Sequence, residues 1–161
     1  MRSSLILFFV LILVSCNDKN NIGKTESSYT NTIDIQAELA SIEKTRQTFM
    51  KAVKEGDGET IGKLVTQDVK IISPGSSDWN DMYKTTKNQG PFPYDSIVMA
   101  PKETIIASDS IAYDFGVSNV FYTNNEGVVV ELEDTFLVIL KKGDDGVWRL
   151  HREVASSNVI E

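Results

Sequence analysis

The stretch that decides the fold is residues 110–158, which read SIAYDFGVSNVFYTNNEGVVVELEDTFLVILKKGDDGVWRLHREVASSN. It contains three extended runs, at 111–122, 128–142 and 147–154, rich in the β-branched and aromatic residues that favour strands. The two joints, 124–127 and 143–146, are short and contain the Asn, Asp and Gly residues typical of hairpin turns. Three strands in tandem predict an antiparallel meander, which needs other elements to cover its apolar face.

The chain before this stretch predicts a long first helix. Asp34 is suited to cap its start, and Gly56 is suited to end it. The apolar residues of the segment recur close to every 3.6 positions, as on one face of a helix: Ile35, Leu39, Ile42, Phe49 and Val53. A helix of about 20 residues with this pattern is long enough to lie across a sheet.

Shorter elements follow this helix. Asp57 predicts the start of a second helix, and residues 69–73 read as a short strand. Ser77 or Asp78 is expected to cap a third helix that Gly90-Pro91 ends. Residues 96–107 predict another strand, with Pro101 indicating an edge position or a bulge. Helices first and antiparallel strands afterwards predict an α+β fold, with the N-terminal helices packed on one face of a curved, mainly antiparallel sheet.

The N-terminal residues 1–15 are typical of a signal peptide. One positive charge precedes the apolar run 5–14, which is shorter than the about 20 residues that span a bilayer. Residues 13–16, LVSC, resemble the lipobox of bacterial lipoproteins, and Cys16 is the only cysteine. We expect lipidation of Cys16, a flexible tether over 16–31, and an exported, lipid-anchored protein of the bacterial cell envelope. The alternative is a plain secretory signal followed by an incidental cysteine.

The charge of the chain restricts its partners. The net charge of −7 becomes −8 when Arg2 leaves with residues 1–15. An acidic surface argues against nucleic acid and against binding to anionic lipid, so the membrane contact would rest on the Cys16 anchor. One histidine, one cysteine and no Gly-rich phosphate loop predict neither a metal nor a cofactor.

The order of these elements resembles the nuclear transport factor 2-like superfamily, and its SnoaL-like branch in particular. The resemblance covers about residues 33–158 of the predicted domain at 32–161. It rests on Gly56-Asp57, on Asp68, on residues 109–116 and on the ending DGVWRL at 145–150. It implies a cone-shaped fold with a cavity between sheet and helices. The superfamily includes isomerases, cyclases, dehydratases and non-catalytic members, so the fold does not establish the function.

The ketosteroid isomerases of this superfamily provide a test of catalysis. Their oxyanion-binding tyrosine falls at Phe49 here, and their proton-moving aspartate falls at Ser73. Phenylalanine has no donor, and serine titrates too high to act as a base near neutral pH. The resemblance therefore does not extend to this isomerase chemistry.

Several other residues are candidates for the cavity. Alternation from Trp148 places Leu150, Arg152 and Val154 on one face, so Arg152 would need Asp114, Asp134 or an anionic ligand as its partner. The strand around Asp114 has a face of small residues and an apolar face, and the sequence leaves open which one is inward. Aromatic residues are expected at the mouth of the cavity, as packing for the third helix or as a ligand lid: Trp79, Tyr83, Phe92 and Tyr94.

His151 and Glu153 share a strand face and could form a base with an orienting carboxylate. We favour the alternative in which they belong to a polar set on the solvent face of the sheet.

The expected function is a lipid-anchored domain that binds a small molecule or a partner protein without catalysis, as a homodimer through its open sheet face. The alternative is a SnoaL-like enzyme using acid–base chemistry of the isomerase, cyclase or dehydratase type, with Asp114, Asp134 or His151. A third possibility is a structural lipoprotein whose cavity is packed shut by Trp79, Trp148 and Phe136.

Overall fold

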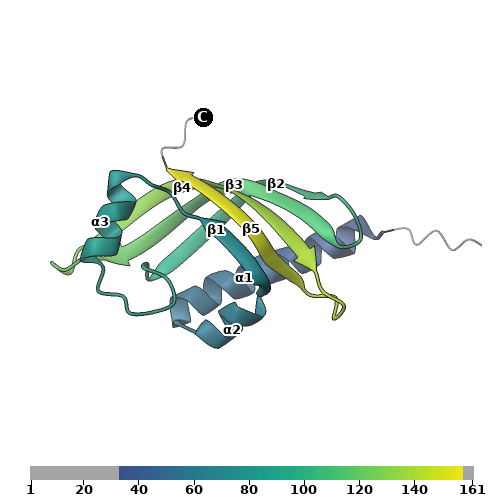
Figure 1. The fold of residues 1–161 in the computed structure, drawn as a ribbon, viewed down its shortest axis with the longest axis horizontal. Helices are drawn as coiled ribbons and strands as arrows, with labels where there is room; N and C mark the ends of the chain where they lie inside the picture. Colours follow the sequence, from purple (N-terminus) through teal and green to yellow (C-terminus); the bar gives the residue numbers. More distant parts are fainter. Residues whose placement is uncertain (1–32, 158–161) are drawn as a thin grey trace, which may run out of the picture. The chain divides into compact units, whose positions relative to one another are not determined.

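The computed structural model describes residues 33–157. Its elements, in chain order, are α1 (Ile35–Glu55), α2 (Gly58–Lys63), β1 (Val65–Ile72), α3 (Ser77–Thr85), β2 (Ser96–Ile106), β3 (Ile111–Thr123), β4 (Val129–Lys142) and β5 (Trp148–Ser157) (Figure 1). This confirms the predicted α+β order. The predicted signal peptide, the lipidation of Cys16 and the tether at 16–31 lie outside the described residues.

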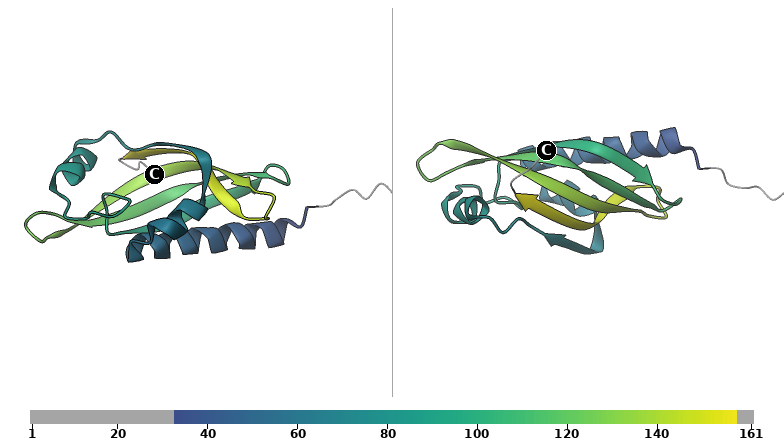
Figure 2. Two further views of the ribbon diagram at one scale, coloured as in Figure 1. Left: turned by 60° about the horizontal axis from the view of Figure 1, so that its bottom comes forward. Right: turned by 90° about the horizontal axis from the view of Figure 1, so that it is seen from above.

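The five strands form one mixed sheet in the order β1-β5-β4-β3-β2. Strands β2 to β5 are antiparallel neighbours, whereas β1 pairs in parallel with β5, the last strand of the chain. Figure 2 shows α1 lying along one face of this sheet, with α3 at one end. The opposite face of the sheet carries no described helix.

Local chemistry explains where the helices begin and end. The Asp34 carboxylate accepts the backbone N–H of Ala37 at 3.1 Å, and Gly56 takes the left-handed conformation that ends α1, with φ of 66°. Asp57 caps α2 in the same way. Helix α3 differs from the prediction, because Ser76 accepts the Trp79 N–H and the backbone becomes extended already at Thr86.

Strand β1 also differs from the prediction, since it begins at Val65 rather than at residue 69. Its first residues extend far enough to pair with β5, where Val65 faces Leu150.

No helix of the described residues is long and apolar enough to cross a membrane.

Pro101 marks an irregular edge, as predicted. Strand β2 lies at the edge of the sheet, and its register with β3 shifts between Pro101 and Glu103. Here the backbones approach so closely that a Cβ on Gly116 would lie 2.3 Å from the carbonyl oxygen of Ala100. Position 116 therefore requires glycine, because any larger side chain would clash with the backbone of β2.

The structure decides which face of β3 is inward. Its small and polar residues Ala112, Asp114 and Ser118 are buried, whereas Tyr113 and Phe115 are exposed on the outer face. Pairing across the sheet aligns Phe115 with further apolar residues of the outer face, which we call the outer row: Phe115, Leu137, Val154 and Ile72, on β3, β4, β5 and β1. Their side chains are between 39% and 63% exposed.

The interior contains two groups of buried apolar side chains. One lies under the first half of α1 and includes Ile42, Phe136 and Trp148. Trp148 is fully buried and donates its indole N–H to Glu38 at 2.8 Å. The other group lies near α3 and includes Trp79 and Tyr94.

Candidate functional site

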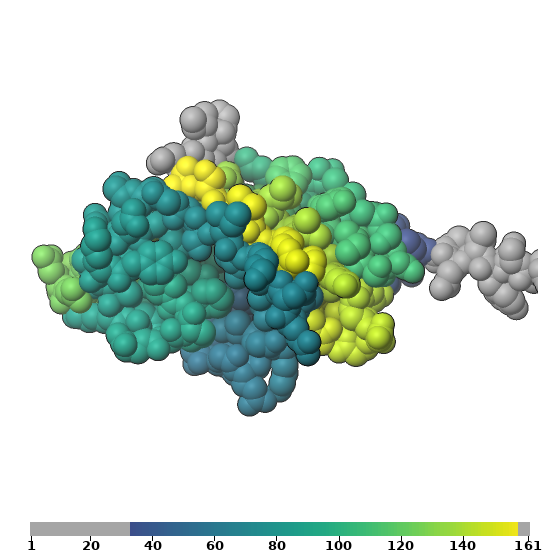
Figure 3. All heavy atoms as spheres, viewed as in Figure 1, coloured from purple at the N-terminus to yellow at the C-terminus, as the bar shows by residue number. Residues whose placement is uncertain are grey.

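A cavity of about 110 Å³ opens between the helices and the inner face of the sheet. Members of both buried groups line it, among them Ile42, Val138, Trp79 and Tyr94. Figure 3 shows a narrow recess between α3 with its following loop and the α2–β1 segment. The volume is below the about 300–1,000 Å³ usual for drug-sized ligands, so the space suits a small molecule.

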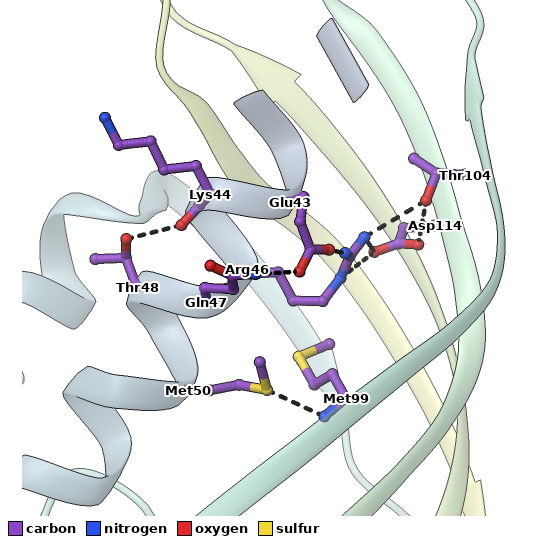
Figure 4. Close-up of polar contacts among 9 residues, drawn as sticks. All are labelled: Glu43, Lys44, Arg46, Gln47, Thr48, Met50, Met99, Thr104 and Asp114. Carbon is purple, nitrogen blue, oxygen red and sulfur yellow. Dashed lines mark hydrogen bonds and ion pairs between the residues drawn. The ribbon is translucent and has the colours of Figure 1, made fainter. Parts of the chain in front are cut away.

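The first polar feature of the cavity is a buried ion pair between Arg46 of α1 and Asp114 of β3 (Figure 4). The Nη2 of Arg46 lies 2.8 Å from Oδ2 of Asp114, and the two side chains are 6% and 5% exposed. The Thr104 hydroxyl donates to Oδ1 of Asp114 at 3.0 Å, and Glu43 pairs with Nη1 of Arg46. The partner of Asp114 is therefore Arg46, and not Arg152 as considered from the sequence.

Arg152 does not face the cavity. Its guanidinium donates to the backbone carbonyl of Asp68 at 2.8 Å and to the Asp68 carboxylate at 3.3 Å, on the outer side of the sheet. The cause is a register shift in the pairing of β5 with β4, where Leu140 pairs with Leu150 and Ile139 pairs with Arg152. The extra residue reverses the alternation after Leu150.

The same shift carries Glu153 inward. Leu150 and Glu153 both line the cavity, whereas Val154 is 51% exposed. The interpretation that placed Glu153 with His151 on the solvent face is therefore wrong for Glu153. His151 remains on the other side, where its Nδ1 lies 3.1 Å from the Thr66 hydroxyl.

Glu153 is the titratable group best placed for chemistry in this cavity. Burial raises its pKa from 4.5 to about 7, because an apolar surrounding disfavours the charged form. The carboxyl makes no hydrogen bond or ion pair with any other residue of 33–157. A carboxyl with a pKa near neutrality can hold or release a proton under ordinary conditions.

Tyr94 provides a second unengaged polar group. Its side chain is 6% exposed and lines the cavity, and its hydroxyl has no hydrogen-bond partner among the described residues. Burial raises the pKa of this hydroxyl, and the negative charge of Glu153 raises it further. Tyr94 therefore stays protonated and can donate a hydrogen bond to a ligand.

The predicted aromatic residues all line the cavity: Trp79, Tyr83, Phe92 and Tyr94. Phe92 stacks on Tyr94 at 5.1 Å between ring centroids, and it meets Phe49 of α1 edge-on at 5.7 Å. Tyr83 is 54% exposed and stands at the opening. These rings form a continuous wall along one side of the cavity.

Asp134 lies outside the cavity and anchors this wall. It is 1% exposed and accepts the Trp79 indole N–H and the Ser157 hydroxyl, each at 2.8 Å. Burial raises the pKa of Asp134, and the two hydrogen bonds oppose this increase. Because both donors belong to the protein, Asp134 is a structural group that holds α3 against the sheet.

Trp148 also lies outside the cavity, buried near the start of α1. Trp148 and Phe136 do not fill the cone, so the cavity predicted to be packed shut in a purely structural protein is open. Phe49 and Ser73 both line it. Among residues 33–157 no group of three or more His, Cys, Asp or Glu side chains is arranged to hold a metal ion.

Solved structures with the same architecture identify the fold. No protein-family model matches the chain, and no curated protein matches it. A ketosteroid isomerase-like protein from Erwinia carotovora atroseptica is similar to it, with a TM-score of 0.57, 21% identity, and coverage of 76% of this chain and 98% of that one. The chain has the nuclear transport factor 2-like fold.

Two further structures with this nuclear transport factor 2-like fold are similar to the chain. An NTF-2 like protein of unknown function from Shewanella oneidensis has a TM-score of 0.55 and 19% identity, covering 74% of this chain and 98% of that one. A dehydratase candidate from Streptomyces avermitilis has a TM-score of 0.57 and 16% identity, covering 78% and 99%. Identities this low establish the fold alone.

Two residues of this nuclear transport factor 2-like cavity escaped the sequence-based reasoning. Arg46 had a visible signal, because it falls on the apolar face of α1 between Ile42 and Phe49, where a charge needs a buried partner. Glu153 had none, since strict alternation from Trp148 assigns it to the opposite face.

Proposed function

We propose that the protein binds a small, largely apolar molecule in the cone cavity. The observation that carries this proposal is the pair of cavity-lining groups without protein partners, the Glu153 carboxyl and the Tyr94 hydroxyl. Neither group is sealed from solvent, because every fully buried side-chain nitrogen or oxygen of residues 33–157 has a hydrogen-bond partner, so both groups can bond to a ligand that enters the cavity. Arg46 and Asp114, the oppositely charged pair of the cavity, already satisfy each other.

Native mass spectrometry of the purified full chain tests this proposal. We expect a reproducible additional mass that disappears on denaturation, and its loss or weakening in a Tyr94→Phe, Glu153→Gln double variant. A ligand retained unchanged by this variant would contradict the placement of the site. Absence of any adduct, together with no stabilisation by a library of small molecules, would contradict small-molecule binding itself.

Acid–base catalysis is a second candidate, favoured by the pKa of Glu153 near 7. In this reaction the Glu153 carboxylate takes a proton from a carbon next to a carbonyl group, and the Tyr94 hydroxyl donates to the resulting enolate oxygen. The dehydratase candidate from Streptomyces avermitilis shares the fold and thereby adds support. NMR in D₂O tests this reaction by following the exchange of hydrogen for deuterium in a panel of small ketones. If the Glu153→Gln variant exchanges hydrogen as fast as the unaltered protein, this role of Glu153 is excluded.

We further propose that a lipid on Cys16 anchors the domain to the bacterial cell envelope after removal of residues 1–15. The support is the lipobox-like sequence at 13–16 and the polar stretch that follows it. Replacing Cys16 with Ser should move the protein from the membrane fraction to the soluble fraction. A variant that stays in the membrane fraction would contradict the anchor.

The outer row supports the proposal of a homodimer through the open sheet face. The outer row places four exposed apolar side chains in line across four neighbouring strands. A contiguous apolar surface of this kind is usually covered by another molecule, such as a second copy of the chain. Leu137→Lys, at the centre of the row, should shift the protein to monomer in sedimentation velocity. Val128→Lys is a matched control, since Val128 is 53% exposed against 51% for Leu137 but lies outside the row. If the two variants have the same oligomeric state in sedimentation velocity, this interface is excluded.

A further inference from the structure

The charges of the cavity do not balance when Glu153 is ionised. The charged and titratable side chains that line it come from four elements and one loop: Arg46 of α1, Tyr83 of α3, Tyr94 before β2, Asp114 of β3 and Glu153 of β5. Arg46 and Asp114 neutralise each other at 2.8 Å. The carboxylate of Glu153 is thus left as one uncompensated negative charge in a mostly apolar space.

No cation of the described chain is available to compensate this charge. Arg46 is the only lysine or arginine of residues 33–157 that lines the cavity, and its guanidinium is occupied by Asp114, Thr104 and Glu43. Arg152, next in sequence to Glu153, is held by Asp68 on the opposite face of the sheet. A carboxylate left in this position attracts a positive charge from solution.

The aromatic side chains of the cavity also favour a positively charged ligand. Trp79, Tyr83, Phe92 and Tyr94 line the cavity together with Glu153. The faces of aromatic rings carry partial negative charge and attract cations, most strongly where water is excluded. An aliphatic surface of equal area would bind a neutral ligand equally well. It would not favour a cation over that neutral ligand.

We infer that the ligand is a small organic cation, whose ammonium group pairs with Glu153 and whose hydrocarbon part lies against the aromatic wall. This inference rests on the proposed function, small-molecule binding in the cone, and it specifies the chemical class. The volume of about 110 Å³ limits the ligand to few heavy atoms, such as a quaternary ammonium group with a short chain. An anion would instead meet the uncompensated carboxylate, with no free positive group to bind it.

Choline and its uncharged carbon analogue 3,3-dimethyl-1-butanol form a matched pair of probes. They have the same shape and differ in the positive charge, so their comparison isolates the cation. Isothermal titration calorimetry is carried out on the full chain, purified in a non-ionic detergent. At pH 8.5 we expect choline to bind at least about tenfold more tightly than the alcohol, as cation–π attraction and a charge pair together allow.

The pH dependence gives a second, independent result. Choline keeps its charge at every pH, so a change in its affinity reports on the protein. Because Glu153 has a pKa of about 7, choline binding at pH 5.5 should be about tenfold weaker than at pH 8.5, and roughly 30-fold weaker if only the ionised form binds. A neutral ligand that accepts a hydrogen bond from protonated Glu153 would show the opposite trend.

Two variants complete the test. Glu153→Gln should weaken choline binding at pH 8.5 by at least about tenfold and remove its pH dependence, with little effect on binding of the alcohol. Glu103→Gln, at an exposed position on β2, should leave both unchanged. The pH series on the unaltered protein needs no variant, so the inference stays testable even where Glu153→Gln folds poorly.

The outcomes separate the inference from the proposed function. If the alcohol binds as tightly as choline, or choline binds more tightly at pH 5.5, the cation is excluded while small-molecule binding stands. The cationic ligand is also excluded, and small-molecule binding also stands, if neither probe binds and native mass spectrometry finds a neutral or acidic adduct. If neither probe binds and no adduct is found, both fail.

Discussion

Replacing Glu153 with Gln should stabilise the protein above pH 7, although the substitution lies in the proposed binding site. The folded protein holds the Glu153 proton with a pKa of about 7, whereas the ordinary value is 4.5. Between these values the folded state binds more protons than the unfolded state, so the free energy of unfolding decreases as the pH rises through this window. Above pH 7 the folded protein bears the full cost of the buried charge.

The size of this cost follows from the two pKa values. At about 1.4 kcal/mol for each tenfold change in proton affinity, the difference between 4.5 and about 7 corresponds to about 3 kcal/mol. Since the side chain is only partly buried, we expect Glu153→Gln to gain about 1–3 kcal/mol at pH 8.5. At pH 4 the gain should nearly vanish, because Glu153 is then neutral in the folded protein.

Urea unfolding of the full chain at pH 8.5 and pH 4, followed by tryptophan fluorescence, measures this difference. Glu103→Gln provides the control, since Glu103 is exposed and its replacement should change stability little at either pH. A Glu153→Gln variant less stable than the unaltered protein at pH 8.5 would refute the argument. So would a gain that is equal at both pH values, because it would then not come from the charge.

Three further substitutions test other parts of the structure by the same unfolding assay. Arg46→Met should cost about 3–5 kcal/mol by leaving Asp114 buried without its partner, and adding Asp114→Leu should restore most of the loss; simple addition of the two losses would contradict the coupling. Gly116→Ala should cost about 1–3 kcal/mol, because its Cβ would meet the backbone of β2; an unchanged stability would mean that β2 moves freely. Trp79→Phe should cost about 1–3 kcal/mol by removing one of the two hydrogen bonds to buried Asp134, with faster amide exchange in α3; unaltered exchange would show that this bond does not hold α3.

Much of the fold could be predicted because its signals are local. Asp34, Gly56 and Asp57 act on the backbone within a few residues of themselves, so helix ends could be assigned from the sequence. The turns at 124–127 and 143–146 joined strands whose composition was already clear, and Gly127 and Gly146 have the positive φ that such turns require. The boundaries of α3 were less certain because three neighbouring polar residues, at 76–78, were all suitable caps.

The candidate site could be predicted only in part. Asp114 and the aromatic residues were candidates for the cavity and line it in the structure, although the sequence left open which face of the Asp114 strand is inward. Asp114 was considered as one possible partner of Arg152, whereas the structure pairs it with Arg46. Arg46 and Asp114 are 68 positions apart and meet only when α1 packs on the sheet, a contact that no local pattern records.

The sequence by itself determined the element order and the hairpins, and it predicted an edge position or a bulge for the strand that contains Pro101. Only the tertiary structure decided which side chains face the cavity. The inner face of a strand is set by the sheet and the helix packed on it, and one extra residue reverses every side chain beyond it. The irregular pairing near His151 does this in β5: it turns Arg152 outward to Asp68 and brings Glu153 into the cavity, the group on which the proposed function depends.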